Sequence, residues 1–139
     1  MPFQLHPQLE KDSSPVYDLP LCEIRLYHNA AFPWLLLIPQ RANCTEIIDL
    51  TASDQIQLLK EIVLTSKILK AHYSPKKLNV ANLGNVVEQL HIHVIARFES
   101  DAAWPNPVWN SSVNKNYSIE NKKNMIDRLH LAYCEHDGN

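Results

Sequence analysis

The stretch NLGNVVEQLHIHVIARF, residues 82–98, decides the fold. Its centre alternates polar and apolar side chains strictly, which is the period of a half-buried strand. Side chains at i and i+2 of a strand point the same way. The pattern therefore predicts a strand over residues 89–97 with Gln89, His91, His93, Ile95 and Arg97 on one face, while Leu90, Ile92, Val94 and Ala96 fill the core.

The flanking sequence supplies the rest of a sheet. Three more strands are predicted, over residues 21–29, 32–39 and 77–81. The first two are expected to pair through a turn at 29–31. A long helix is predicted from Thr51 to about His72, and a second one begins at Ser118. Strands without a repeated strand-helix-strand rhythm indicate an α+β fold on an antiparallel sheet.

The long helix has a recognisable start and an apolar side. Thr51 and Asp54 have the spacing of a capping box. Apolar residues then recur at helical spacing, which predicts a buried face made of Ile56, Leu59, Ile62, Val63 and Leu69. For the second helix the predicted inner face consists of Ile119, Met125, Ile126, Leu129 and Ala132.

Length and composition favour one domain. The 139 residues carry a net charge of −2, which gives no basic footprint for long nucleic acids. Residues 1–20, with four of the nine prolines, are expected to form an irregular arm, with a short helical turn at 7–11, ahead of a single domain over 21–139. The longest apolar run is far shorter than the ~20 residues of a membrane-spanning helix. Three scattered cysteines and no signal peptide favour a soluble, cytoplasmic protein.

Three interpretations of His91 and His93 remain open from the residues alone. They could be ordinary half-exposed sheet residues. They could chelate zinc or iron, although no obvious third ligand accompanies them. They could also serve covalent catalysis, because a neutral imidazole is a nucleophile toward phosphorus. Gly84 and Asn85 nearby form a turn whose N–H groups and side-chain amide could hold an anion.

The segment GNVVEQLHIHVIAR, residues 84–97, resembles the signature of the histidine triad (HIT) superfamily, Gly-Gln-Ser/Thr-Val-x followed by His-φ-His-φ-His-φ-φ with φ hydrophobic. Gly84 falls on the glycine, Asn85 on the glutamine, and Gln89, His91 and His93 on the three histidines. FPWLLLIPQR, residues 32–41, is similar to the family's second strand. The resemblance spans roughly residues 20–98 and implies a HIT-like fold, with a roughly five-stranded antiparallel sheet and two main helices.

The resemblance also implies a function, that of a hydrolase or transferase for small purine nucleotides. His91 would attack the α-phosphate, His93 would bind the phosphate, and a nucleotidyl-histidine would form without a metal or other cofactor. Gln89 would act beside them. A homodimer is implied as well. The substrate contacts expected are Asn29, Asn82, Gly84, Asn85, Arg97 and Trp104.

Three departures from the family pattern bear on activity. Gln89 replaces the first histidine, Val86 replaces a Ser or Thr that usually donates to the phosphate, and Trp34 replaces the usual histidine of the second strand. A catalytically weak nucleotide-binding module is therefore the main alternative. Trp104 and Trp109, in a proline-punctuated loop, could stack on a base or instead cover the sheet or a subunit interface.

Overall fold

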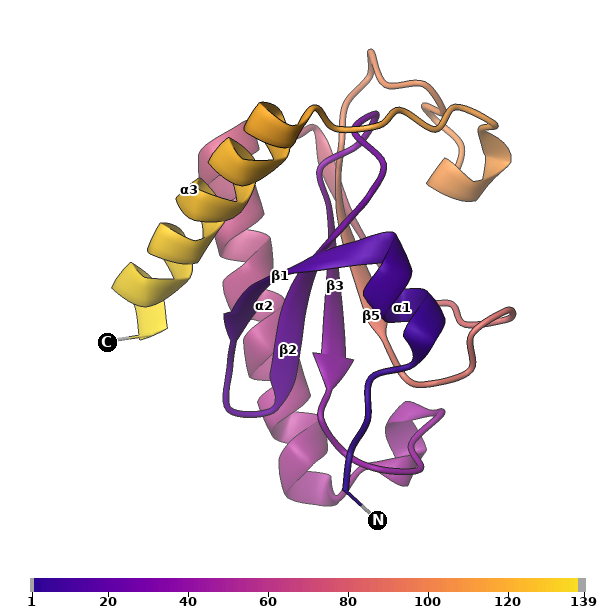
Figure 1. Cartoon of the computed structure of the whole chain (residues 1–139), viewed down its shortest axis with the longest axis vertical. Helices are drawn as coiled ribbons and strands as arrows, with labels where there is room; N and C mark the ends of the chain where they lie inside the picture. Colours follow the sequence, from indigo (N-terminus) through magenta and orange to yellow (C-terminus); the bar gives the residue numbers. More distant parts are fainter. Residues whose placement is uncertain (1, 138–139) are drawn as a thin grey trace.

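Five strands form one antiparallel sheet in the computed structural model, which describes residues 2–137 (Figure 1). In spatial order the sheet runs β1-β2-β3-β5-β4. The strands are β1 (Ser13–Asp18), β2 (Cys22–Tyr27), β3 (Trp34–Pro39), β4 (Lys77–Asn82) and β5 (Ile92–Arg97). The helices are α1 (Pro7–Asp12), α2 (Ala52–Tyr73) and α3 (Ile119–Asp137), with short 3-10 turns at Ile47–Asp49 and Val108–Asn110. The predicted α+β class is confirmed.

Both faces of the sheet are covered, each by a different set of elements. Helix α2 packs on β3 and β5, and α3 packs on β1 and α2. Helix α1 lies over the opposite face (Figure 1). Two separate apolar clusters result, one containing Leu90, Ile92 and Val94 and the other containing Trp34 and Ile95. Strand β5 is therefore buried on both sides, whereas the alternation alone predicted a half-exposed strand.

The pairing that the sequence predicted for the first two apolar strands is confirmed. β2 and β3 pair antiparallel, with Cys22 opposite Pro39 and Leu26 opposite Leu35. Every residue of β3 is buried, as expected for a continuously apolar strand. β3 then pairs with β5, with Leu36 opposite His93. This register brings Trp34 to the same face as His93, two residues away along β3.

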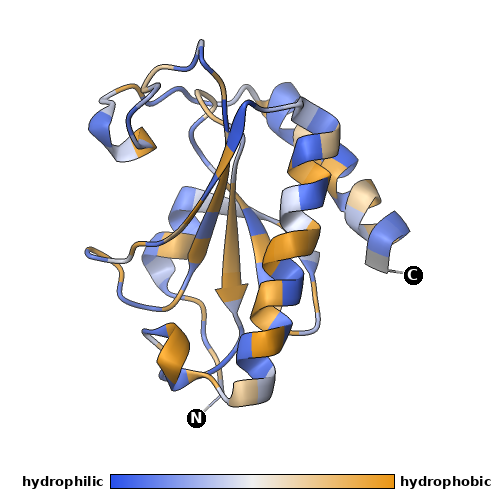
Figure 2. Ribbon diagram, turned by 180° about the vertical axis from the view of Figure 1, so that it is seen from behind, coloured by the Kyte–Doolittle hydropathy of each residue, from blue (hydrophilic) through white to orange (hydrophobic). Residues whose placement is uncertain are grey.

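Helix α2 begins as predicted but buries a different side. Thr51 is its N-cap, and its hydroxyl accepts a hydrogen bond from the backbone N–H of Asp54. Three residues of the predicted inner face are exposed instead: Ile56, Leu59 and Val63. Figure 2 shows hydrophobic colour along the side of α2 turned toward the viewer. Of the predicted set, Leu69 is buried and Ile62 packs against the core.

The buried side of α2 carries polar residues because they have partners. Glu61 accepts hydrogen bonds from the backbone N–H groups of Leu21 and Cys22, at 2.9 and 2.8 Å. Thr65 bonds to the hydroxyl of Tyr133 on α3 at 2.6 Å. Buried polar groups are tolerated when they are paired in this way. Helix α3 is close to its prediction, with Leu129 and Ala132 buried, but Ile119 is exposed.

The first twenty residues form regular structure where an irregular arm was expected, although the helical turn predicted at 7–11 is confirmed as part of α1. Residues 7–12 form α1, and residues 13–18 form β1, which pairs antiparallel with β2. The side chains of Leu9 and Val16 lie in the two apolar clusters. The prolines are accommodated because Pro7 stands in the first turn of α1 and Pro15 is on an edge strand. Among residues 2–137, no helix combines the length and the apolar character needed to cross a membrane.

Candidate active site

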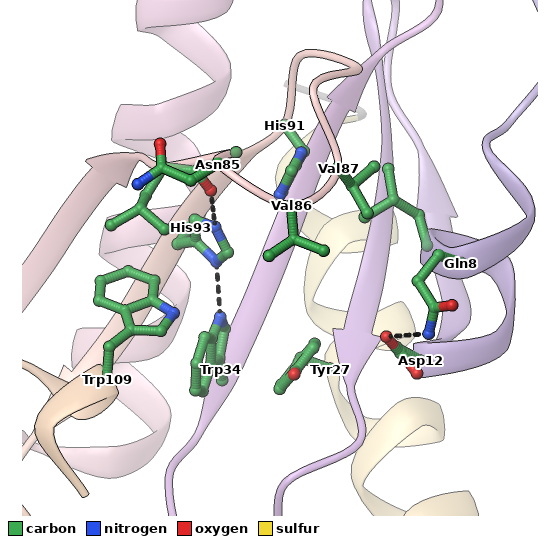
Figure 3. Close-up of a pocket in the computed structure, with 13 residues that line it drawn as sticks. Gln8, Asp12, Tyr27, Trp34, Asn85, Val86, Val87, His91, His93 and Trp109 are labelled. Carbon is green, nitrogen blue, oxygen red and sulfur yellow. Dashed lines mark hydrogen bonds between the residues drawn. The ribbon is translucent and has the colours of Figure 1, made fainter.

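A cavity of about 380 Å³ lies on the α1 face of the sheet, above the ends of β2, β3 and β5 (Figure 3). His91 and His93 line it together with Trp34 and Tyr27 of the sheet. The other walls are α1, the 3-10 turn at Val108–Asn110 and the loop that joins β4 to β5. These contribute Gln8, Leu9, Asp12, Leu83, Gly84, Asn85, Val86, Val87 and Trp109.

His91 is held with one ring nitrogen toward the cavity. Its Nδ1 lies 2.7 Å from the carbonyl oxygen of Gln89, which can only accept, so Nδ1 carries the proton. Burial lowers the pKa of His91 below the ordinary 6.5; the hydrogen bond to the Gln89 carbonyl opposes this shift in part, and nearby His6 adds a smaller lowering. Near neutral pH the ring is therefore uncharged, and Nε2 keeps a free lone pair. Figure 3 shows this ring hanging over the cavity beside Val86.

His93 is locked from both sides. The indole Nε1–H of Trp34 donates to its Nδ1 at 3.0 Å, and its Nε2–H donates to the carbonyl of Leu83 at 2.9 Å (Figure 3). Burial lowers the pKa of His93 to about 4, and the neighbouring His91 adds to that shift. Neither nitrogen is left to donate to a phosphate, so the direct contact expected for His93 is absent from this arrangement. The ring instead packs edge-on against His91, with centroids 4.9 Å apart.

Gly84 is required because a side chain at this position would clash with its neighbours, and not because of its backbone conformation. Its φ is not positive, so the conformational freedom expected for this glycine is not used. A Cβ at this position would stand 2.5 Å from the carbonyl oxygen of Val87 and 3.3 Å from Cε1 of His91. Real Cβ atoms do not approach a backbone oxygen so closely. The absence of a side chain therefore lets the loop pass directly over the His91 ring.

The rest of this loop lines the cavity with one polar and several apolar groups. Asn85 is exposed at the rim of the cavity (Figure 3). Val86 is 97% exposed and presents two methyl groups where a hydroxyl was expected from the family pattern. Gly84 and Asn85 thus line the same cavity as His91 and His93.

The side chain of Gln89 points away from this cavity. Its Oε1 accepts from the backbone N–H of His6 at 2.9 Å, and its Nε2 donates to the carbonyl of Gln4 at 2.8 Å. Only its main-chain carbonyl touches His91. The expected catalytic part for the Gln89 side chain is therefore not supported, because its amide is fully engaged in holding residues 4–6 against the loop. Gln89 also borders a second, polar cavity of about 290 Å³.

Arg97 and Trp104 do not reach the cavity. Arg97 is 1% exposed and makes a bidentate ion pair with Asp101, at 2.8 and 3.1 Å. Two more of its N–H groups donate to Asn79 and to the carbonyl of Asn106. The ring of Trp104 lies against the guanidinium at 5.8 Å. Both residues, predicted as substrate contacts, instead build the loop that follows β5, because a buried arginine needs its donors satisfied.

Asn29 and Asn82 are also placed elsewhere. Asn29 is buried, and its carboxamide bonds to Ala31, Val113 and Lys115. These bonds hold the loop before α3 against the β2–β3 turn. Asn82 lies at the end of β4 and donates to Glu46 at 3.3 Å beside the second, polar cavity. Neither residue lines the cavity of the two histidines, so their predicted nucleotide contacts are not supported by this geometry.

Five polar or aromatic lining residues were not among the predicted site residues: Gln8, Asp12, Tyr27, Trp34 and Trp109. Trp34 could have been predicted to line the site, because it occupies the position of the usual histidine in the family's second strand. The sequence offered both Trp104 and Trp109 as stacking residues. Of the two, Trp109 lines the cavity, with its ring edge-on to His93 at a centroid distance of 4.9 Å. Tyr27 packs on Trp34 at 4.3 Å. Gln8 and Asp12 belong to no motif, and residues 1–20 were expected to form an arm outside the domain.

No group of three or more His, Cys, Asp or Glu side chains that could hold a metal ion is found within residues 2–137. The chelating interpretation of His91 and His93 therefore finds no third ligand in the described part of the chain. The lone pair of His93 is in any case used by Trp34.

Comparisons with known proteins give a consistent result. The model of the HIT domain family matches residues 8–100. A histidine triad protein of Bradyrhizobium japonicum is 42% identical, with a TM-score of 0.92, and the match covers 95% of this chain and 98% of that one. A histidine triad protein of Marinobacter aquaeolei is 33% identical, with a TM-score of 0.93 and coverages of 97% and 98%. One from Sinorhizobium meliloti is 40% identical, with a TM-score of 0.90 and coverages of 94% and 96%. No match was found among the curated proteins.

Proposed function

The chain belongs to the histidine triad (HIT) family, and on that premise we propose that it is a nucleotide phosphohydrolase or nucleotidyltransferase for a small purine phosphoanhydride or phosphoramidate. The observation that carries the proposal is the orientation of His91. A neutral imidazole with its Nδ1–H fixed and its Nε2 lone pair free over a cavity is the form that attacks phosphorus.

The reaction has two balanced steps. In the first, the Nε2 lone pair of His91 attacks the α-phosphorus, a P–N bond forms, and the P–O or P–N bond to the leaving group breaks. The leaving group takes that electron pair and then a proton from solvent. In the second step, water attacks the phosphorus and gives up a proton to solvent, the P–N bond to His91 breaks, and the nucleoside monophosphate departs. Another hydroxyl or amine in place of water gives transfer.

The other lining residues support this chemistry at different levels. The carboxamide of Asn85 is placed to donate to phosphate oxygens as charge develops on them. His93 acts as a positioning residue, because it backs the His91 ring and holds the carbonyl of Leu83 directly ahead of Gly84. Gln89 supplies its main-chain carbonyl, which orients the nucleophile.

A second candidate function is supported by Val86 and His93. Val86 has no hydroxyl and His93 has no free N–H donor, so fewer groups are available to bind the phosphate. A nucleotide-binding module with little turnover fits those two observations. It would keep the cavity and its affinity for nucleotides while forming the covalent adduct slowly.

Intact mass spectrometry separates the two candidates. The protein is incubated with a purine nucleoside phosphoramidate and quenched in alkali, which preserves a phosphorus–nitrogen adduct. For an enzyme we expect a nucleotide-sized mass increase on the wild type and none on His91→Ala. His72→Ala serves as the matched control, because His72 is exposed on α2. Turnover that persists in His91→Ala rejects the nucleophile, and tight binding without any adduct favours the binding module.

We also propose that the protein is a cytoplasmic homodimer that takes no long nucleic acid as a partner. Strand β4 is a sheet edge with Val80 half-exposed, and helix α2, which directly precedes it, exposes Ile56, Leu59 and Val63. Exposed apolar stripes of this kind are typical of subunit interfaces. Sedimentation should give a dimer for the wild type and a monomer for Leu59→Glu, whereas Ile119→Glu, on exposed α3 surface, should remain dimeric. A monomeric wild type contradicts the proposal.

A further inference from the structure

The cavity has a polar wall that the chemistry at His91 does not use. Helix α1 contributes Gln8 and Asp12, four residues apart and therefore on one side of the helix. The Nε2–H of Gln8 donates to Oδ2 of Asp12 at 2.8 Å. Within residues 2–137, the second carboxylate oxygen, Oδ1, has no hydrogen-bond partner. In Figure 3 these two side chains lie across the cavity from Trp109.

This wall is separated from the phosphate end by aromatic rings. Trp34 packs against His93, and Tyr27 packs on Trp34 with centroids 4.3 Å apart. Tyr27 is opposite Ser13 in the sheet, so Asp12, the residue before it, lies next to Tyr27. Burial raises the pKa of Tyr27, and the nearby carboxylate of Asp12 raises it further. A ligand that enters from His91 meets apolar rings before it meets the carboxylate.

The order of these surfaces matches the order of parts in a nucleotide. A phosphate at His91 places the ribose next to it and the base farther along. The faces of Tyr27 and Leu9 are apolar and suit the face of a base, while the carboxylate of Asp12 suits its edge. The Trp109 side offers less room, because that ring stands directly against His93. The base is therefore expected on the α1 side.

We propose that Asp12, oriented by Gln8, makes this site selective for guanine over adenine nucleotides. The inference rests on the proposed function and names its substrate class. Guanine presents two parallel donors, N1–H and the 2-amino group, and a carboxylate is an acceptor-only pair of oxygens that receives both. Adenine presents the lone pair of N1 at the same place, which faces a negative charge without a proton between them.

Binding of the monophosphates tests the assignment without turnover. Calorimetry on the full-length protein should show GMP binding about 10- to 100-fold more tightly than AMP, because a site with a built acceptor rejects the ligand that lacks the donor. The partial exposure of Asp12 keeps this ratio below that of a closed site. Glu10→Gln is the matched control, since Glu10 is exposed on the same helix and does not line the cavity. It should leave both affinities unchanged.

Asp12→Asn gives a change of specificity rather than a simple loss. An asparagine accepts one proton and donates another, so it fits the N1–H and the 2-carbonyl of xanthine and not the two donors of guanine. We expect the preference for GMP to disappear and xanthosine monophosphate to become the tighter ligand. Retention of the GMP preference in this variant would show that another group reads the base.

Two further outcomes overturn the inference. Equal affinities of the wild type for GMP and AMP would remove the selectivity. An equal weakening of both by Asp12→Asn would place the carboxylate on a part that the two ligands share, such as the ribose. If a nucleotidyl adduct still forms on His91 in either case, the proposed function stands and only the base assignment fails. If neither nucleotide binds or forms an adduct, both proposals fail.

Discussion

Trp34 Nε1 donates a 3.0 Å hydrogen bond to Nδ1 of His93, and this bond joins β3 to β5 beneath the cavity. An indole nitrogen can only donate, and the carbonyl of Leu83 can only accept. Together they determine which nitrogen of His93 carries the proton. The imidazole behind the proposed nucleophile is therefore held in one tautomer and one orientation.

Trp34→Phe removes the donor and leaves Nδ1 of His93 buried without a partner. We expect the free energy of unfolding to fall by about 1–3 kcal/mol, while the carbonyl of Leu83 still keeps the proton on Nε2. Denaturant unfolding measures the loss, and nitrogen-15 NMR of the histidine side chains should show protonation at Nε2 of His93 in both proteins. Trp109→Phe is the control, because that indole packs on His93 without hydrogen-bonding to it. An equal loss of stability in Trp34→Phe and Trp109→Phe, or a proton on Nδ1 of His93 in the wild type, would contradict the assignment.

Activity should depend on pH through His91. Burial lowers the pKa of this ring below 6.5, so Nε2 is unprotonated at neutral pH. The rate of adduct formation is expected to be level from pH 8 to 6.5 and to decline only as the pH falls below that value. Rapid-quench measurements across this range provide the check. A rate that already declines between pH 8 and 7 would indicate an ordinary or raised pKa.

Stability should depend on pH through His93. Its pKa is about 4 in the folded protein and near 6.5 when unfolded, so the unfolded chain binds more protons between these values. Folding stability is then complete above pH 6.5 and falls, by on the order of 3 kcal/mol, as the pH approaches 4. Denaturant unfolding at several pH values measures this slope. His93→Asn should flatten it, and an unchanged slope would assign the effect to other groups.

Restoring a hydroxyl at position 86 should raise the reaction rate. Val86 is 97% exposed on the loop over the cavity, so Val86→Ser costs little packing. One added hydrogen bond to phosphate contributes about 0.5–1.5 kcal/mol, which corresponds to a roughly 2- to 10-fold faster adduct formation. Val86→Ala separates the effect of the hydroxyl from that of the lost methyl groups. An equal rate for the Ser and Ala variants would show that no phosphate oxygen comes within reach.

The ion pair between Arg97 and Asp101 is expected to be important for folding. Asp101→Asn leaves a buried guanidinium without its counter-charge, which should cost about 3–5 kcal/mol. Thermal unfolding measures the loss. The control is Glu99→Gln, because the ion pair of Glu99 with Lys76 is exposed and 3.5 Å long, and its loss should change stability by less than about 1 kcal/mol. Similar effects of the two substitutions would contradict the buried character of Arg97.

Local patterns predicted those features that depend on neighbours in the sequence. The alternation at residues 89–94 placed His91 and His93 on one face, and their rings lie 4.9 Å apart. Thr51 caps α2 as its spacing with Asp54 indicated. The pairing of β2 with β3 followed from a short turn between two apolar stretches. The family resemblance predicted the five-stranded sheet and placed Gly84 beside His91, the proposed nucleophile.

Features that depend on distant partners could not be predicted. Glu61 is buried because two backbone N–H groups forty residues earlier need an acceptor, so the apolar pattern of α2 indicated the wrong side. Arg97 is buried because Asp101 and the carbonyl of Asn106 fold back over it. The amide of Asn29 is used up by a loop more than eighty residues away. In each case the residue type suggested solvent or substrate, and the tertiary partner decided otherwise.

The proposed nucleophile is oriented by a peptide carbonyl, and every amino acid supplies one. The side chain at position 89 can therefore change without disturbing the imidazole of His91. In this chain the amide of Gln89 instead hydrogen-bonds to the main chain of Gln4 and His6. A search that requires all three histidines would miss such proteins. The group at position 89 that orients His91 is a main-chain oxygen, which is present whatever the side chain is.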